Sequence, residues 1–147
     1  MTDERFGPLR MSLEGKFVFG FAGGWAQGLN DRKDLYSALK AYTMEFKKTD
    51  PVVFLVHVNP VYNPGVNPFQ LLKSLGIDFE GPEVRFMNSG TMPYDAMPGL
   101  YNVMDVYVCP SVEGFGLTFL DAMSCGKPCI ALCMGGQTDF ITNDNGW

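Results

Sequence analysis

The sequence predicts an α/β fold in which a parallel sheet of about five strands has helices on both faces. Three observations lead to this class. Short apolar runs alternate with segments of helical periodicity, which is the pattern of consecutive β–α–β units. The runs are apolar along their whole length, as expected for strands that are buried on both faces. At 147 residues, the chain has the length of one domain that can bury its own core.

The first strand is predicted at 16–22, where a nearly continuous apolar run ends in Gly23 and Gly24. Glycines directly after a buried strand favour a turn. Four later runs have the same β-forming, apolar character. They are 52–58, 84–87, 106–109 and 128–132.

The first helix is predicted from 33 to 48, with Asp31 or Asn30 as its N-cap and with Lys47 and Lys48 at its negative C-terminal end. Its apolar positions recur at helical spacing. They are Leu35, Leu39, Tyr42 and Phe46.

Glycine and proline residues mark the boundaries of the later helices. These helices are predicted at 69–75, 97–104, 117–124 and from 137 onward. Gly76 should stop the first of them. A helical turn at 92–95 should precede the second, and Pro98-Gly99 should break it.

Charge and hydropathy exclude several classes of protein. The net charge is −5 at pH 7, so the chain lacks the broad positive surface that nucleic acids need. No apolar run approaches the roughly 18 residues of a membrane span. Residues 1–5 carry mixed charges and have no apolar core after them, unlike a signal peptide. We expect neither nucleic-acid partners nor a transmembrane segment.

Cys109, Cys125, Cys129 and Cys133 fall in or beside segments that are predicted to be buried. They form no CxxC pair and have no histidine at metal-ligand spacing. Structural thiols are therefore expected rather than a zinc site or disulfides, and a cytoplasmic location follows as the default.

The most informative segment, 110–128, predicts a strand end, a glycine-rich loop, a short helix and a sharp stop. Glu113 and Asp121 lie eight positions apart across the loop and the helix. Gly114 and Gly116 allow a ligand to approach the backbone closely. The helix directs free N–H groups and a partial positive charge toward the loop, which suits a phosphate. Carboxylates beside such a helix end suit a nucleotide sugar.

This segment resembles the signature of retaining glycosyltransferases with the two-domain GT-B architecture, most closely those of the family-4 type. Their pattern is a Glu, seven residues and a second Glu, within a Pro-Ser, Glu-Gly-Phe-Gly-Leu and Gly-x-Pro frame that 110–128 shares. Asp121 takes the place of the second Glu. Further matches at 32–35, 100–108 and 135–141 extend the resemblance over about 17 to 147.

The resemblance implies a Rossmann-like sheet that forms one half of a GT-B fold. It implies an N-terminal extension at 1–16 and a donor nucleotide-sugar-binding domain at 17–147, which ends earlier than the family's domain does. Family members place an acceptor-binding domain before the donor domain. We therefore expect this chain to belong to a longer enzyme or to act with a partner chain, and to have little activity alone.

Roles for individual residues also follow from the resemblance. Glu113 should contact the hydroxyls of the donor sugar, and Asp121, one methylene shorter than the family's Glu, those of the ribose. Lys33 corresponds to the family's phosphate-contacting Lys, whose ammonium stabilises the charge that grows on the departing diphosphate. Glu113 and Lys33 are thus the predicted catalytic residues. The N–H groups predicted to hold the sugar or the distal phosphate belong to Gly114, Phe115, Gly116, Leu117 and Thr118.

Other donor contacts are predicted in the loops after the first and third strands. Gly23, Gly24 and Arg32 belong to the first loop, and Thr91 belongs to 88–92, where the family holds the nucleotide base through the main chain.

One position departs from the family pattern. The family usually has an arginine about six residues before its lysine, where this chain has Gln27. Arg32 is the candidate substitute. Gly135 and Gly136 are expected to complete the sugar pocket.

Simpler interpretations stay open. Glu113, Asp121 and Lys33 are each compatible with an ordinary solvated position, and His57 is either a site residue or a hydrogen-bonded core histidine. The chain could also be a non-catalytic nucleotide- or sugar-binding module, or a subunit of a larger transferase. A Rossmann oxidoreductase is disfavoured, because no G-x-G-x-x-G follows the first strand and no acid ends the second. With no Asp-x-Asp triplet, we expect no metal and no cofactor besides the donor.

Overall fold

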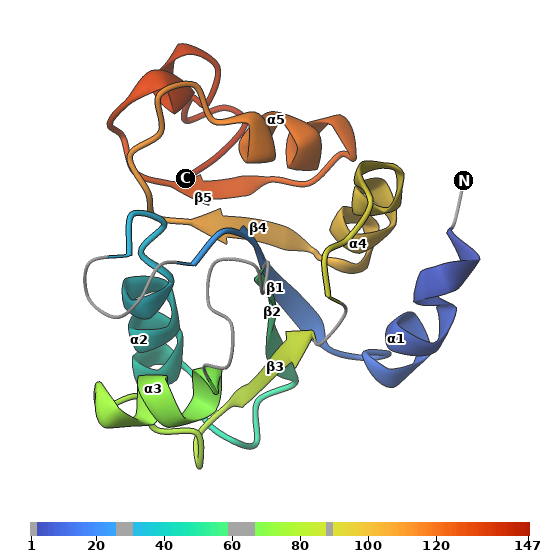
Figure 1. The fold of residues 1–147 in the computed structure, drawn as a ribbon, viewed down its shortest axis with the longest axis vertical. Helices are drawn as coiled ribbons and strands as arrows, with labels where there is room; N and C mark the ends of the chain where they lie inside the picture. The colour runs from blue at the N-terminus through green and yellow to red at the C-terminus, as the bar shows by residue number, and fades with distance from the viewer. Residues whose placement is uncertain (1–2, 26–30, 59–66, 88–89) are drawn as a thin grey trace.

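The computed structural model describes residues 3–25, 31–58, 67–87 and 90–147. Five parallel strands form one sheet in the order β3-β2-β1-β4-β5 (Figure 1). This sheet confirms the predicted α/β class with a Rossmann-like parallel arrangement. The strands are β1 (Phe17–Gly23), β2 (Val52–Val58), β3 (Glu83–Met87), β4 (Val106–Cys109) and β5 (Cys129–Ala131).

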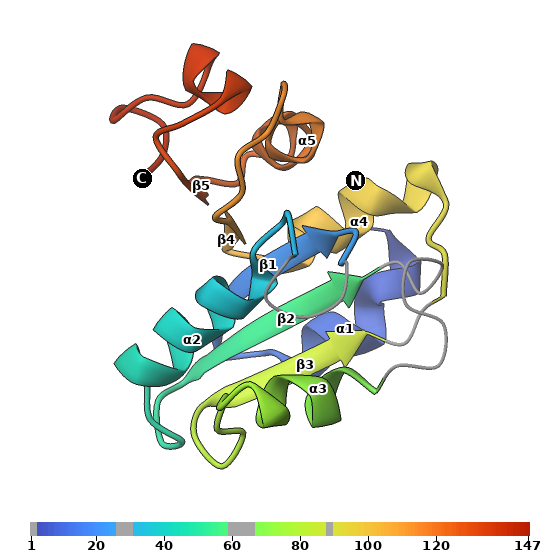
Figure 2. The same ribbon diagram turned by 60° about the vertical axis from the view of Figure 1, so that its left-hand side comes forward.

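Helices cover both faces of the sheet, as the sequence predicts. On one face lie α2 (Leu35–Glu45) and α3 (Pro68–Ser74), and on the other lie α1 (Gly7–Ser12) and α4 (Met97–Val103) (Figures 1 and 2). The remaining helix, α5 (Leu117–Ser124), packs against α4 and β5. The described residues also form the 3-10 helices η1 (Glu4–Phe6), η4 (Tyr94–Ala96) and η5 (Gly136–Asp139).

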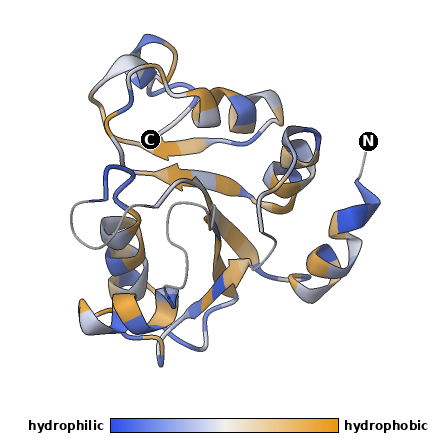
Figure 3. Cartoon of the chain, viewed as in Figure 1, coloured by the Kyte–Doolittle hydropathy of each residue, from blue (hydrophilic) through white to orange (hydrophobic). Residues whose placement is uncertain are grey.

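Aromatic side chains fill both sides of the sheet. On the α2 face, the rings of Phe19 in β1 and Tyr42 in α2 are 5.7 Å apart. On the opposite face, the ring of Tyr107 in β4 lies 5.7 Å from Tyr101 in α4 and 5.4 Å from Phe119 in α5. Strands β2 and β4 are buried along almost their whole length, which explains why these apolar runs do not alternate with polar residues. The edge strand β3 differs: Glu83 and Arg85 alternate with apolar residues, its five residues are only partly buried, and Figure 3 shows hydrophilic colour on it.

The strand order reverses between β1 and β4, and this reversal positions the candidate site. From β1 the chain passes through β2 to β3 on one side, and it then returns to place β4 on the other side of β1. β1 and β4 are paired at Phe19↔Val106 and Gly20↔Tyr107. The loops that follow these two strands turn away from each other, and open α/β sheets bind their ligands at such a point.

Helix α4 is continuous, so the predicted break at Pro98-Gly99 is wrong. Pro98 lies in the first turn, where an N–H group has no intrahelical partner and proline is tolerated. Gly99 is buried against the N-terminal segment, because a Cβ atom at Gly99 would lie 2.5 Å from Cδ2 of Phe6. The 1–16 segment, predicted only as an extension, thus forms η1 and α1 and packs on α4.

Helix α2 is shorter than the predicted 33–48, because two aspartates stabilise a turn ahead of it. Asp34 is the N-cap and has a left-handed φ of 50°. Asp31, one of the two predicted caps, accepts hydrogen bonds from the backbone N–H groups of Lys33 and Leu35, each at 3.2 Å. Lys33 therefore lies in a stabilised turn before the helix rather than in its first turn.

Other boundaries also differ from the prediction. Lys47 and Lys48 follow α2 instead of ending it, and the segment from Gln137 forms the short helix η5 in place of a longer α-helix. Several residues of the sequence analysis lie outside the described residues. They are Gln27, Asn30 and 88–89.

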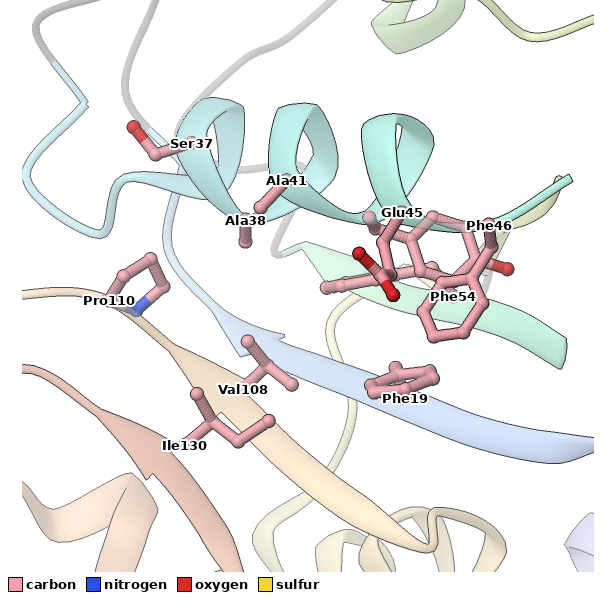
Figure 4. A pocket seen from close by; sticks show the side chains of 11 residues that line it. Phe19, Ser37, Ala38, Ala41, Glu45, Phe46, Phe54, Val108, Pro110 and Ile130 are labelled. Atoms are coloured by element: carbon pink, nitrogen blue, oxygen red, sulfur yellow. The ribbon is translucent and has the colours of Figure 1, made fainter. Parts of the chain in front are cut away.

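An apolar groove lies on the α2 face of the sheet, between α2 and the strands β1, β4 and β5 (Figure 4). Its volume is about 480 Å³, and Phe19, Val108 and Ile130 line it from three adjacent strands. Glu45 is the single charged residue in its lining. Because the described lining contains a carboxylate and no cation, the groove is poorly suited to binding a phosphate. The charged residues that suit an anion lie instead at the ends of the strands.

The contact between Gly99 and Phe6 can be tested with two glycine substitutions. We expect Gly99→Ala to lower the free energy of unfolding by about 1–3 kcal/mol, because the added methyl group overlaps the Phe6 ring. Gly7→Ala is the matched control, since a Cβ atom there meets nothing within 4 Å, and it should change stability by less than about 1 kcal/mol. Urea denaturation measures both. Equal effects of the two substitutions would contradict the packing of η1 on α4.

Candidate functional site

Glu113 lies in the loop between β4 and α5 and is nearly buried, with 9% of its surface exposed. Its backbone forms an isolated parallel bridge with Gly135, and its carbonyl accepts a hydrogen bond from the N–H of Gly136 at 2.8 Å. The predicted sugar-contacting acid therefore belongs to a loop that is paired with the segment after β5. The predicted contribution of Gly135 and Gly136 is thus seen as backbone contact with the Glu113 loop.

Two cations from the turn before α2 converge on the Glu113 carboxylate. Lys33 Nζ lies 2.6 Å from Oε1, and Arg32 Nη1 lies 3.1 Å from Oε2. The Lys33 side chain is 11% exposed, whereas that of Arg32 is 66% exposed. The structure thus brings together three of the predicted site residues across the β1–β4 switch point. It also places Arg32, the candidate substitute for the family's arginine, directly at the predicted acid.

A hydroxyl group completes the surroundings of this carboxylate. Ser111 Oγ donates to Oε1 of Glu113 at 2.6 Å and lies 3.2 Å from the Cys109 sulfur. Burial opposes ionisation of Glu113, but the hydrogen bonds from Lys33, Ser111 and Arg32 outweigh it and hold the pKa of this carboxyl below its ordinary value. Glu113 is therefore a charged acceptor that cations and a hydroxyl hold in place.

The loop and first turn at 114–118 present unused backbone donors. The amides of these five residues donate to no acceptor among the described residues. Gly116 caps α5 with a left-handed φ of 97°, which favours glycine, and no side chain caps the helix. Phe115 and Leu117 are largely exposed. Free N–H groups and the positive end of the α5 dipole together form a place where an anion is favoured.

Asp121 lies in the middle of α5, as predicted, but its carboxylate already has a partner. The hydroxyl of Tyr94 in η4 donates to Oδ1 at 3.0 Å. This hydrogen bond raises the pKa of the Tyr94 hydroxyl above its ordinary value. A ribose hydroxyl would have to replace Tyr94 or share the carboxylate with it.

The remaining predicted contacts are less closely connected to this cluster. Gly23 ends β1 beside Lys33, because a Cβ atom at Gly23 would lie 3.7 Å from Lys33 Cε. Gly24 directly follows it and is partly exposed, and Thr91 is an exposed residue between β3 and η4.

The histidine and the cysteines have no evident place in the site. His57 is buried at the carboxyl end of β2, where burial lowers its pKa, which favours a core histidine. All four cysteines are free thiols. Cys133 is exposed and lies just beyond the end of β5, which stops at Ala131.

Two polar residues of this cluster escaped the sequence analysis, namely Ser111 and Gln137. Ser111 precedes Glu113 by two positions, and in extended backbone such residues point the same way, so its role was accessible from spacing. Gln137 is completely buried and donates from Nε2 to the carbonyl of Ser111 at 2.8 Å. Its role was not accessible, because it depends on the approach of two loops.

The described residues show neither a metal-binding cluster nor a membrane-spanning helix. Within residues 3–25, 31–58, 67–87 and 90–147, no group of three or more His, Cys, Asp or Glu side chains is placed to hold a metal ion. In the same ranges, no helix has the length and hydropathy to cross a bilayer.

A five-stranded parallel sheet with helices on both faces and a charged cluster at its switch point defines a protein of the Rossmann-like α/β class. A comparison with protein families matches residues 16–147 to "Glycosyl transferases group 1". The chain belongs to this family of glycosyltransferases. The expected relationship to GT-B glycosyltransferases is thereby confirmed.

Proteins with a similar sequence include three named glycosyltransferases. The 2-deoxystreptamine N-acetyl-D-glucosaminyltransferase of Streptomyces fradiae is 36% identical over 44% of this chain and 16% of its own length. The mannosyltransferase WbdA of Escherichia coli is 27% identical over 94% of this chain and 16% of its own length. The 2-deoxystreptamine glucosyltransferase of Streptomyces kanamyceticus is 28% identical over 94% of this chain and 32% of its own length.

Solved structures share the fold at low identity. Anabaena Alr3699/HepE in complex with UDP and glucose matches with a TM-score of 0.68 and 23% identity, over 100% of this chain and 38% of that one. The trehalose 6-phosphate synthase of Burkholderia multivorans matches with a TM-score of 0.62 and 10% identity, over 92% of this chain and 32% of that one. The chain thus spans about a third of these solved chains and about a sixth of the first curated relatives.

The buried carboxylate predicts a specific pH dependence of stability. Because its pKa is lowered in the folded state, Glu113 contributes stability that is present above its unfolded-state pKa of about 4.3 and is lost as the pH falls through the folded-state value. We expect Glu113→Gln to lower the free energy of unfolding by on the order of 1–3 kcal/mol at pH 7. The difference from the wild type should shrink steadily below about pH 4.

Glu14→Gln serves as the control, because Glu14 is exposed and has no ion pair among the described residues. Denaturant unfolding curves between acid and neutral pH measure the difference. A deficit of Glu113→Gln that is the same at every pH would rule out an ionised, stabilising carboxylate.

Proposed function

We propose that residues 17–147 form the donor-binding domain of a retaining glycosyltransferase, and that the donor is a nucleoside diphosphate sugar. One observation carries the proposal. Lys33 and Arg32, from the segment before α2, converge at the switch point on the carboxylate of Glu113, whose loop also bears the free amides of 114–118. Cations and amides suit the diphosphate, and a charged acceptor suits sugar hydroxyls. HepE, with a similar fold, has been solved with UDP-glucose.

In this proposal the residues have separate tasks. Glu113 accepts hydrogen bonds from the sugar, while Lys33 and Arg32 contact the diphosphate together with the amides of 114–118. As the glycosidic bond breaks, negative charge grows on the diphosphate, and a pre-positioned ammonium stabilises the transition state more than the ground state. Asp121 contacts the ribose, and the loop containing Thr91 contacts the base. Transfer proceeds with retention of the anomeric configuration.

The acceptor side of the reaction is proposed to come from outside this chain. The described residues of the site all come from loops of one sheet, and the known relatives are several times longer. An acceptor-binding domain, or a partner chain that supplies one, would face these loops.

A second candidate function is a nucleotide- or sugar-binding module without catalysis. The observation in its favour is the Tyr94–Asp121 hydrogen bond, since an acid that is one methylene short and already engaged is poorly placed for ribose. Binding without transfer in the full-length context would support this candidate.

Measurements of donor binding should distinguish the contribution of Lys33, which is proposed to contact the diphosphate, from that of Glu113, which is proposed to contact the sugar. We expect Lys33→Ala to weaken binding of both a nucleoside diphosphate and its sugar conjugate by about 10–100-fold, the equivalent of one charge-assisted hydrogen bond. Glu113→Gln should weaken binding of the conjugate selectively, because only the sugar contacts this residue in the proposal. Calorimetric titration with uridine, guanosine and adenosine diphosphate sugars measures both effects.

Lys40→Ala is the matched control, because Lys40 lies on α2, the helix that follows Lys33, and its ammonium donates to the carbonyl of Gly76. It should bind the donor as the wild type does. If the wild-type chain binds none of these nucleotides, or if Lys33→Ala binds them unchanged, the proposed site is wrong.

The chain alone should bind donor weakly and transfer little sugar, because an acceptor domain adds the second wall of the site. Radiolabelled donor incubated with this chain should release sugar no faster than in a protein-free control. Rapid transfer to an added acceptor would overturn the proposal that the acceptor side lies elsewhere.

A further inference from the structure

We propose that Gln137 is a positioning residue that holds the Glu113 loop so that its carboxylate faces Lys33 and Arg32. The inference rests on the function proposed above for Glu113. The Gln137 side chain acts on Glu113 through backbone groups, the N–H of Glu113 and the carbonyl of Ser111, and not through the carboxylate.

The side-chain amide of Gln137 bridges two loops. Nε2 donates to the carbonyl of Ser111 at 2.8 Å and to the carbonyl of Leu132 at 3.2 Å. Oε1 accepts from the backbone N–H of Glu113 at 3.1 Å. Two carbonyls and one N–H fix the orientation of the amide, because only NH₂ can donate and only the oxygen can accept. The side chain is fully buried, so water does not compete for these bonds.

Close backbone contact surrounds this amide. The N–H of Gly136 donates to the carbonyl of Glu113 at 2.8 Å. A Cβ atom on Gly135 would lie 2.7 Å from that same carbonyl oxygen, and one on Gly136 would lie 2.1 Å from the carbonyl oxygen of Gly114. The two glycines therefore allow the 135–137 segment to lie close to the Glu113 loop, and the hydrogen bonds of Gln137 stabilise this contact.

The hydrogen bonds to the Glu113 backbone determine the direction in which its side chain points. The N–H and the C=O of Glu113 are both bound to the 135–137 segment, so the two peptide groups that flank its Cα cannot rotate freely. The Cα–Cβ bond is thereby aimed at Ser111 Oγ and the two cations. Without the amide, the buried N–H of Glu113 and the buried carbonyl of Ser111 lose a partner, as does the more exposed carbonyl of Leu132. The loop is then expected to move toward solvent to satisfy them.

The test uses the whole chain and the carboxyl signal of Glu113 in carbon-13 NMR. In Gln137→Met, which keeps the length and removes the amide, the measured pKa of Glu113 should rise by about one pH unit as contact with Lys33 and Arg32 loosens. Gln137→Glu, which keeps the acceptor for the Glu113 N–H but loses both donors, is the second variant. Ile77→Val removes one buried methylene far from this loop and is the stability control, which should leave that pKa unchanged.

A donor measurement follows on the same proteins. Gln137→Met should bind a nucleoside diphosphate sugar about tenfold more weakly and the free nucleoside diphosphate nearly as well as the wild type. Combined with Glu113→Gln, it should add no further loss for the conjugate, because both changes remove one interaction.

The outcomes separate the two proposals. A raised pKa in a wild-type chain that binds no nucleotide sugar would support the positioning of Glu113 and overturn the proposed function. An unchanged pKa in a folded Gln137 variant would overturn the positioning role, whatever the donor affinity. If neither variant folds while Ile77→Val does, Gln137 is a requirement of the fold and the positioning proposal is also overturned.

Discussion

The interaction on which the site depends is the pairing of the buried Glu113 carboxylate with Lys33 and Arg32. A carboxylate that is removed from water costs several kcal/mol unless partners replace its hydration. Here two cations from the loop after β1 and one hydroxyl from the loop after β4 supply them. The pairing therefore ties together two loops that the strand order drives apart. Breaking it would leave an unpaired buried charge, so the loops are held in one arrangement.

This pairing also suits an exchange of partners. The cations and the carboxylate neutralise one another, and the Lys33 and Glu113 side chains are already almost buried, whereas Arg32 is exposed to solvent. A diphosphate that approaches the amides of 114–118 would take over the cations, and sugar hydroxyls would take over the carboxylate. Such a site needs little reorganisation at the moment of reaction, which is the condition for strong electrostatic stabilisation of a transition state.

The apolar groove beside α2 illustrates why size alone does not identify a functional site. It is a large hollow, but its lining is made of apolar groups with Glu45 as the one charge. The charged cluster lies beyond the carboxyl-terminal ends of β1 and β4, close to where Pro110 lines the groove, and its chemistry comes from a few polar groups that are held by hydrogen bonds. Asp121 and Tyr94 form a second polar pair, which shows that the two acids of the motif have different environments despite their regular spacing.

The sequence by itself determined the fold class, the five strands and the loops that bear the site, because apolar runs, glycines and prolines act through local physics. Through the resemblance to a family it also predicted site roles for Glu113, Lys33 and Arg32, three residues that the structure brings together. Local rules failed where distant parts meet: α4 passes through Pro98-Gly99 because Phe6 packs against it. Only the tertiary structure decided that Lys33 pairs with Glu113, that Tyr94 engages Asp121 and that Gln137 holds the loop. These contacts join residues between 24 and 80 positions apart, and no local pattern encodes which distant groups a parallel sheet will bring within hydrogen-bonding distance.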